Sequence, residues 1–204
     1  MSTAYVQVNL PITNVLCLDM AIQEAGGTWN APEIIHEIRR AKLATETAQG
    51  TKSLISANNA YAELLRALSP ETIPRTIQVN LEGMTLTFTK NRGQYSTRTR
   101  TETRSGLIAA IQSISKLYDK NMRLIENELN KAIQTLEEQK DLLSAEQVQS
   151  LRSVIEGQQR TIQSANQERV DEVTKEIEEK LAARGFEVRK RMVGKKIVYQ
   201  AVRR

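Results

Sequence analysis

The sequence predicts an α+β protein in which a small antiparallel β-sheet base with helices carries a long antiparallel helical hairpin, or coiled coil. Three observations lead to this prediction. Apolar and polar residues alternate with period two in residues 4–10, 76–103 and 186–202. Across residues 106–184 apolar residues recur instead every three or four positions. Aromatic residues make up only 4% of the chain, which suits long helices with narrow apolar stripes.

A short strand and a helix are expected at the start of the chain. Residues 4–10 alternate like a half-buried strand, and Pro11 is expected to end it because proline has no N–H to donate. Thr13 or Asn14 can cap a helix that runs to about residue 25, where two glycines follow.

Two more helices and a β-meander follow. Residues 30–75 are expected to form a helical insertion, with Pro32 in the first turn of one helix and Gly50 separating it from the next. From residue 76 the period changes to two, and turns after Leu81 and around Gly93 divide the segment into three strands. The last strand is rich in Thr and Arg, so we expect it either at an edge of the sheet or facing solvent.

The segment 106–184 contains two apolar stripes of similar length. Ser144 is followed three residues later by Gln147, a capping box that marks the start of a second helix. Two stripes joined by a short polar break are typical of an antiparallel hairpin, with arms of roughly 50 Å. Glutamines interrupt the second stripe near Gly157, where we expect the arm to be weakest.

Gly185 is expected to end the second long helix, and a terminal β-hairpin follows it. We predict one base domain built from residues 1–105 and 185–204, with residues 106–184 as the projecting hairpin. If the terminal hairpin and the meander belong to one sheet, their basic residues can form a phosphate-binding patch. The residues concerned are Arg92, Arg98, Arg100, Arg189, Arg191, Lys195, Lys196, Arg203 and Arg204.

Charge is distributed unevenly along the chain. The net charge is +5, yet residues 107–183 carry 10 basic and 14 acidic side chains, whereas residues 184–204 carry 8 basic and 1 acidic. Basic strands suggest contact with a phosphate backbone, but Lys and Arg also protect exposed strands from aggregation. Tyr95 and Tyr199 are the candidates for stacking on bases, so no stacking platform is evident.

No catalytic pattern is present. His36, the only histidine, has no set of further ligands at metal-binding spacing, and we expect it to be solvent-exposed. Cys17 lies within an apolar helix and is expected to be buried and inert. Phosphate-binding glycine loops are missing from the sequence. We therefore expect a non-enzymatic protein with no cofactor, no metal and no small-molecule substrate.

The location is expected to be cytoplasmic. One cysteine cannot form an internal disulfide, and the N-terminal residues lack the basic and apolar blocks of a secretion signal. No apolar run approaches the 18 residues of a membrane span, so no membrane contact is expected.

The order of elements carries a family resemblance. A helix ends in Gly26-Gly27 with Trp29 just beyond, a later helix contains Leu117-Tyr118, and Gly185-Phe186-Glu187-Val188 precedes the terminal hairpin. In this the chain resembles, over about half its length, the small domain-of-unknown-function family encoded in cyanobacteria and algal plastids. Members are often encoded beside an AAA-type ATPase, so the resemblance implies an accessory or adaptor role and no catalytic residues.

These observations together predict an adaptor or assembly protein that binds a protein partner or itself through the helical hairpin. Leu142 and Leu143 would be presented at its tip. The resemblance adds a role accessory to an AAA-type ATPase. The alternative is a nucleic-acid-binding module that uses a basic β-sheet face.

Overall fold

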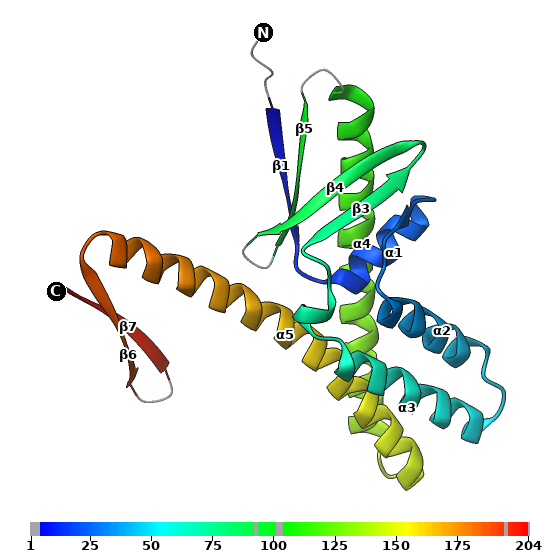
Figure 1. Ribbon diagram of the computed structural model, residues 1–204. Helices are drawn as coiled ribbons and strands as arrows, with labels where there is room; N and C mark the ends of the chain where they lie inside the picture. Colours follow the sequence, from blue (N-terminus) through cyan, green and yellow to red (C-terminus); the bar gives the residue numbers. More distant parts are fainter. Residues whose placement is uncertain (1–4, 92–93, 101–103, 194–195, 204) are drawn as a thin grey trace.

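The computed structural model describes residues 5–91, 94–100, 104–193 and 196–203. The strands are β1 (Tyr5–Ile12), β2 (Thr28–Trp29), β3 (Thr76–Leu81), β4 (Met84–Asn91), β5 (Gln94–Arg100), β6 (Phe186–Val193) and β7 (Lys196–Arg203). The helices are α1 (Val15–Glu24), α2 (Glu33–Thr47), α3 (Thr51–Ala67), α4 (Arg104–Gln139) and α5 (Ala145–Ala183), with a 3-10 turn η1 (Pro70–Thr72). The predicted α+β class is confirmed, and Figure 1 shows a body from which α5 extends to β6 and β7.

An antiparallel sheet of order β1-β5-β4-β3-β2 forms one side of the body. Of the two alternatives for the third meander strand, the edge position is wrong, since β5 lies between β1 and β4. The expectation that Pro11 ends the first strand is also wrong. The register of β1 on β5 shifts between Asn9 and Ile12, which lets the strand continue past the proline.

The core joins the sheet to α1 and α4. Alternate residues of β3 and β4 are buried, as their period of two predicts. Helix α1 is buried along most of its length and packs against α4. Asn14 caps α1 as predicted: its Oδ1 accepts from the backbone N–H of Leu16 at 2.9 Å and of Cys17 at 3.3 Å. Tyr118 of α4 accepts with its hydroxyl from the N–H groups of Thr13 and Asn14, both at 3.1 Å.

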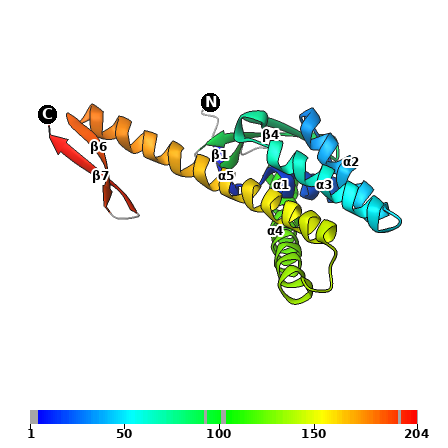
Figure 2. The same cartoon turned by 90° about the horizontal axis from the view of Figure 1, so that it is seen from below.

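The two long helices and the capping box between them are confirmed. Ser144 Oγ accepts from Gln147 N at 3.2 Å, and Gln147 Oε1 accepts from Ser144 N at 2.9 Å. From this turn the helices diverge, as Figure 2 shows. Helix α4 packs on α1, whereas α5 packs chiefly along α3. The two apolar stripes therefore do not pair with each other along their whole length, because part of α4 packs on α1 and part of α5 packs on α3.

The last two strands lie apart from the main sheet. β6 and β7 form their own two-stranded antiparallel sheet at the end of α5. The terminal strands therefore do not extend the five-stranded sheet, and a base domain of residues 1–105 and 185–204 stays a prediction. Local alternation correctly located the strands, but it carries no information on which sheet a strand joins.

Candidate interaction surface

A close helix crossing fixes α5 to the body. A Cβ added to Gly157 would lie 3.0 Å from the backbone oxygen of Ala62 and 3.3 Å from Leu65 Cβ, so the two helix backbones nearly touch here. One turn further, the hydroxyl of Thr161 can donate to either of two backbone oxygens, that of Gly157 at 3.0 Å or that of Leu65 at 3.2 Å. Arg66 Nη2 donates to Glu156 Oε2 at 3.0 Å. The part of the second stripe that was expected to be weakest is thus the part through which α5 packs on α3.

A half-buried ion pair marks the point where α5 leaves the body. Lys90 of β4 pairs with Glu168 of α5, and the lysine ammonium lies 5.9 Å from the centre of the Tyr95 ring. Burial, with the nearby Glu168 carboxylate, raises the pKa of Tyr95, whose hydroxyl donates to the backbone oxygen of Pro74 at 3.2 Å. A small pocket adjoins the pair. Its only charged lining residues among those described are Lys90 and Glu168, which neutralise each other.

Beyond this ion pair the chain projects as an arm, which we define as residues 168–203. Figures 1 and 2 both show it extending away from the body. The helical part, residues 168–183, is about 24 Å long at about 1.5 Å per residue. Gly185, at φ 80°, ends the helix in the left-handed region, and its N–H donates to the backbone oxygen of Ala182 at 3.0 Å.

The arm carries an apolar row. Val170, Val173, Ile177 and Leu181 follow one another at helical spacing and therefore share one face. Val170 is 53% exposed and Ile177 is 50% exposed, while Val173 and Leu181 are half-buried. A row of this regularity at the surface of a helix is typical of a face that binds another protein.

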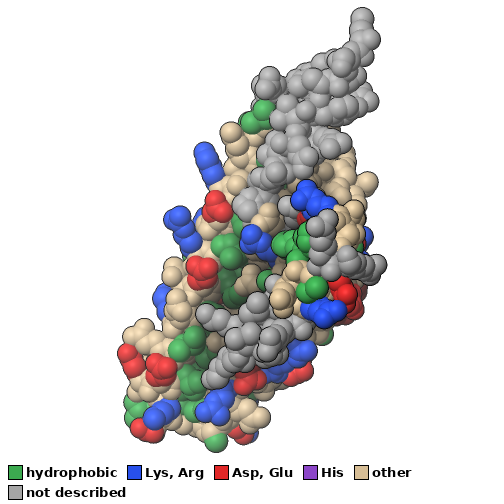
Figure 3. Space-filling model, turned by 90° about the vertical axis from the view of Figure 1, so that its left-hand side faces the viewer, with side chains coloured by type: hydrophobic (Ala, Val, Ile, Leu, Met, Phe, Trp, Pro, Cys, Tyr) green, Lys and Arg blue, Asp and Glu red, His purple; other side chains and the backbone are tan. Residues whose placement is uncertain are grey.

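Charge differs between the two parts of the arm. Residues 168–183 carry six acidic and three basic side chains, whereas residues 184–203 carry seven basic and one acidic. Ion pairs along α5, such as Lys180 with Glu176, stabilise the isolated helix only weakly because they are exposed to solvent. Seen from the side that carries the arm, charged and hydrophobic side chains are interspersed over the surface (Figure 3).

The hairpin tip predicted to bind a partner presents one leucine rather than two. Leu142 is 86% exposed, whereas Leu143 is half-buried. The N–H groups of both residues donate to the backbone oxygen of Gln139, at 2.9 and 3.0 Å. This turn directs one side chain outward and the other back toward the helices. A single exposed leucine is normal on a protein surface.

The basic residues do not meet on one sheet. Arg98 and Arg100 lie on β5 of the five-stranded sheet, whereas Arg189, Arg191, Lys196 and Arg203 lie on β6 and β7. Arg189 is exposed, with its Nε 3.5 Å from Glu187 Oε1. Arg92, Lys195 and Arg204 lie outside the described residues. The condition for a merged phosphate-binding patch is therefore not met, and nucleic-acid binding stays a prediction.

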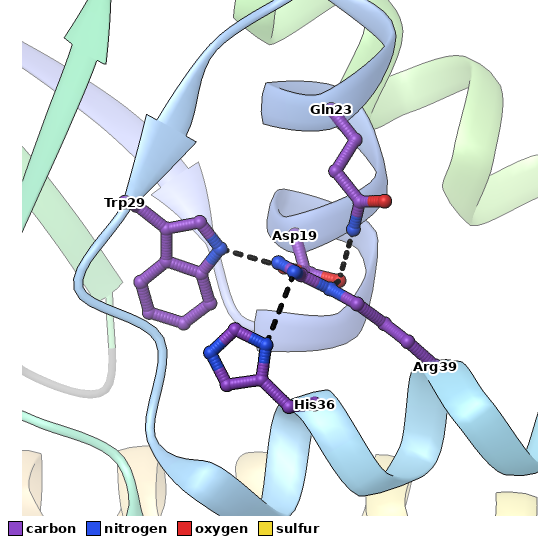
Figure 4. Close-up of polar contacts among 5 residues, drawn as sticks. All are labelled: Asp19, Gln23, Trp29, His36 and Arg39. Carbon is purple, nitrogen blue, oxygen red and sulfur yellow. Dashed lines mark hydrogen bonds and ion pairs between the residues drawn. The ribbon is translucent and has the colours of Figure 1, made fainter.

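A buried carboxylate joins three segments of the body (Figure 4). Asp19 accepts from Trp29 Nε1 at 2.6 Å, from Gln23 Nε2 at 2.7 Å and from Arg39 Nε at 2.8 Å. This bonding raises the pKa of the Arg39 guanidinium. His36 is half-buried rather than exposed as expected, with Nδ1 3.5 Å from Arg39 Nη1. Because the carboxylate is saturated with donors, the cluster holds α2 to α1 and offers no general base.

Cys17 is buried, as predicted. Its Sγ donates to Met122 Sδ at 3.2 Å, and burial raises the pKa of the thiol to about 12. Over the described part of the chain, no three His, Cys, Asp or Glu side chains converge to hold a metal ion. Within the same part, every helix is too short or too polar to cross a lipid bilayer.

Comparisons with family models, curated proteins and solved structures find no match. The resemblance to the plastid and cyanobacterial family thus stays a prediction. What the chain binds must be argued from its geometry.

Sequence reasoning located the apolar row but assigned it to the seam of a coiled coil. Its spacing is the same whether a row is covered or free, so the pattern alone cannot separate the two cases. Gly157 was the residue from which the packing of α5 on α3 could have been predicted. A glycine inside a long helix often marks a close approach of another backbone, and that approach takes α5 away from α4.

Proposed function

We propose that this chain is a non-enzymatic assembly or adaptor protein that binds a protein partner through its arm. The observation that carries this proposal is the apolar row of α5, which continues beyond the Lys90–Glu168 ion pair and remains half-exposed at Val170 and Ile177. A helix face of this kind fits a groove or another helix in a partner.

The energetics favour a rigid helical binding surface. Full burial of a Val or Ile side chain contributes about 1.5–3 kcal/mol, so covering the exposed half of Val170 and of Ile177 contributes roughly 1 kcal/mol each. The helix is continuous with the docked part of α5, held at Gly157, Thr161 and Glu168. Little conformational entropy is therefore lost when the arm binds.

The partner class comes from the sequence. The family resemblance makes an AAA-type ATPase the first candidate, with this chain as its accessory subunit in the cytoplasm. The basic β6–β7 sheet at the end of the arm favours an acidic rim on the partner, since complementary charge speeds association.

Site-specific photocrosslinking in cells tests the proposal. A photoreactive amino acid at Ile177 is expected to give a discrete protein adduct, and the same residue at Leu43 of α2 provides the control. Leu43 is 60% exposed, so both positions are apolar, helical and accessible, but Leu43 lies off the arm. Equal adducts at both positions, or none at Ile177, would contradict the proposal.

A further inference from the structure

The two edges of the five-stranded sheet are built differently. At one edge β2 has only two residues, and beyond it Asn30 closes part of β3: Asn30 Oδ1 accepts from Gln78 N at 2.8 Å and Asn30 N donates to Gln78 O at 3.3 Å. At the other edge β1 is eight residues long and pairs on one side only, with β5, among the described residues. A long strand with a free side is a template for another strand.

The first five residues of β1 also lack the usual protection of an edge strand. Natural edges carry Lys or other charges, a bulge or a proline that blocks pairing. In this chain the first charged residue of the sequence is Asp19, after β1 has ended. Pro11 and the register shift come only after Asn9, so the five residues Tyr5–Asn9 form a regular and uncharged edge.

We infer that β1 is a dimer interface, where β1 of a second copy of this chain pairs with it antiparallel to make one continuous sheet. The twofold axis falls at Gln7, the centre of the regular segment Tyr5–Asn9. Tyr5 then lies opposite Asn9 of the second copy and Val6 opposite Val8. β-branched pairs of this kind stabilise antiparallel sheets.

The charge pattern selects a second β1 over the other candidate strand of the chain. The terminal sheet, β6–β7, is strongly basic, and β5 places Arg98 and Arg100 next to β1, so that sheet would meet like charge at this edge. β1 itself brings no charge. A twofold contact also needs only one kind of surface, which is the commonest way in which soluble chains associate.

The inference concerns a different surface from the arm and does not depend on it. Two body domains joined at β1 would carry two arms. If each arm binds a partner, the pair binds a repetitive partner with higher avidity than either arm alone.

Equilibrium sedimentation of the full chain with matched variants tests the interface. Gln7→Glu brings two carboxylates together across the proposed twofold axis, and like charges directly opposite each other destabilise a strand pair. We expect a dimer for the native chain and at least a tenfold higher dimer Kd for Gln7→Glu. Gln78→Glu, the same change on the exposed side of β3, should leave the Kd unchanged.

A disulfide provides the positive test. Residues at a twofold axis in an antiparallel sheet have Cα atoms about 4.5–5.5 Å apart, within disulfide reach. Gln7→Cys is therefore expected to crosslink two chains under mild oxidation, whereas Gln78→Cys is not. Buried Cys17 should not interfere.

A monomer at all concentrations, or a dimer unaffected by Gln7→Glu and not crosslinked through Cys at position 7, would overturn the inference. A dimer that instead dissociates on Ile177→Glu would assign self-association to the arm. Crosslinking of the arm to another protein bears only on the proposed function, so the two proposals can fail separately.

Discussion

Substitution of Gly157 by alanine tests the helix crossing that directs α5 away from α4. The new methyl group would lie 3.0 Å from the backbone oxygen of Ala62 and 3.4 Å from its Cα, so the backbones of α3 and α5 must separate. Overpacking of this kind costs about 1–3 kcal/mol, while alanine gains up to about 1 kcal/mol over glycine inside a helix. The expected net loss is about 1 kcal/mol, a fall in Tm of about 2–4 °C for a chain of this size.

Gly106→Ala is the matched control. Gly106 is exposed in the first turn of α4, where an added Cβ meets only Met84 Sδ at 3.9 Å, an ordinary contact. The same substitution should therefore leave Tm unchanged or raise it by a degree or two, through helix propensity alone. Thermal unfolding followed by circular dichroism at 222 nm distinguishes a fall in Tm for Gly157→Ala from an unchanged or higher Tm for Gly106→Ala. A Gly157→Ala variant as stable as the native chain would refute the close crossing of α3 and α5.

Three further predictions concern the buried polar groups. Asp19→Ala leaves Arg39 and Trp29 Nε1 without their acceptor. It should lower the free energy of unfolding by about 3 kcal/mol in urea titrations. A loss below about 1 kcal/mol would mean that the cluster does not hold α2 in place. The thiol of Cys17, buried and with its pKa raised to about 12, should stay unreactive toward Ellman's reagent at pH 8 until urea unfolds the chain; rapid labelling of the native protein would contradict its burial. Burial also raises the pKa of Tyr61 to about 12. Between about pH 9 and 12 the unfolded chain therefore loses protons that the folded chain retains, and the free energy of unfolding should fall as pH rises through this window. A constant free energy of unfolding from pH 8 to 11 would exclude this linkage.

Features set by a few neighbouring residues could be predicted from the sequence. Asn14 caps α1, Ser144 and Gln147 form the capping box, and Gly185 ends α5. Each depends on backbone groups within four residues, so the sequence contains the whole interaction.

Features set by distant partners could not be predicted. The pairing of β1 with β5 joins segments about ninety residues apart and moved a strand from the edge to the interior of the sheet. The preference of α5 for α3 depends on a close fit at Gly157 that periodicity does not record. The apolar row of the arm was visible as a pattern, but its exposure depends on where α5 lies.

The arrangement of β1 has a consequence during synthesis. Its partner β5 is made about ninety residues later, roughly 5–20 s at common elongation rates. During that interval the nascent chain exposes β1 and the apolar surface of α1, and no charged side chain between Tyr5 and Leu18 keeps neighbouring polysomal chains apart. Cooler growth does not remove this delay, since it slows translation as well, whereas a chaperone that holds the first twenty-five residues would.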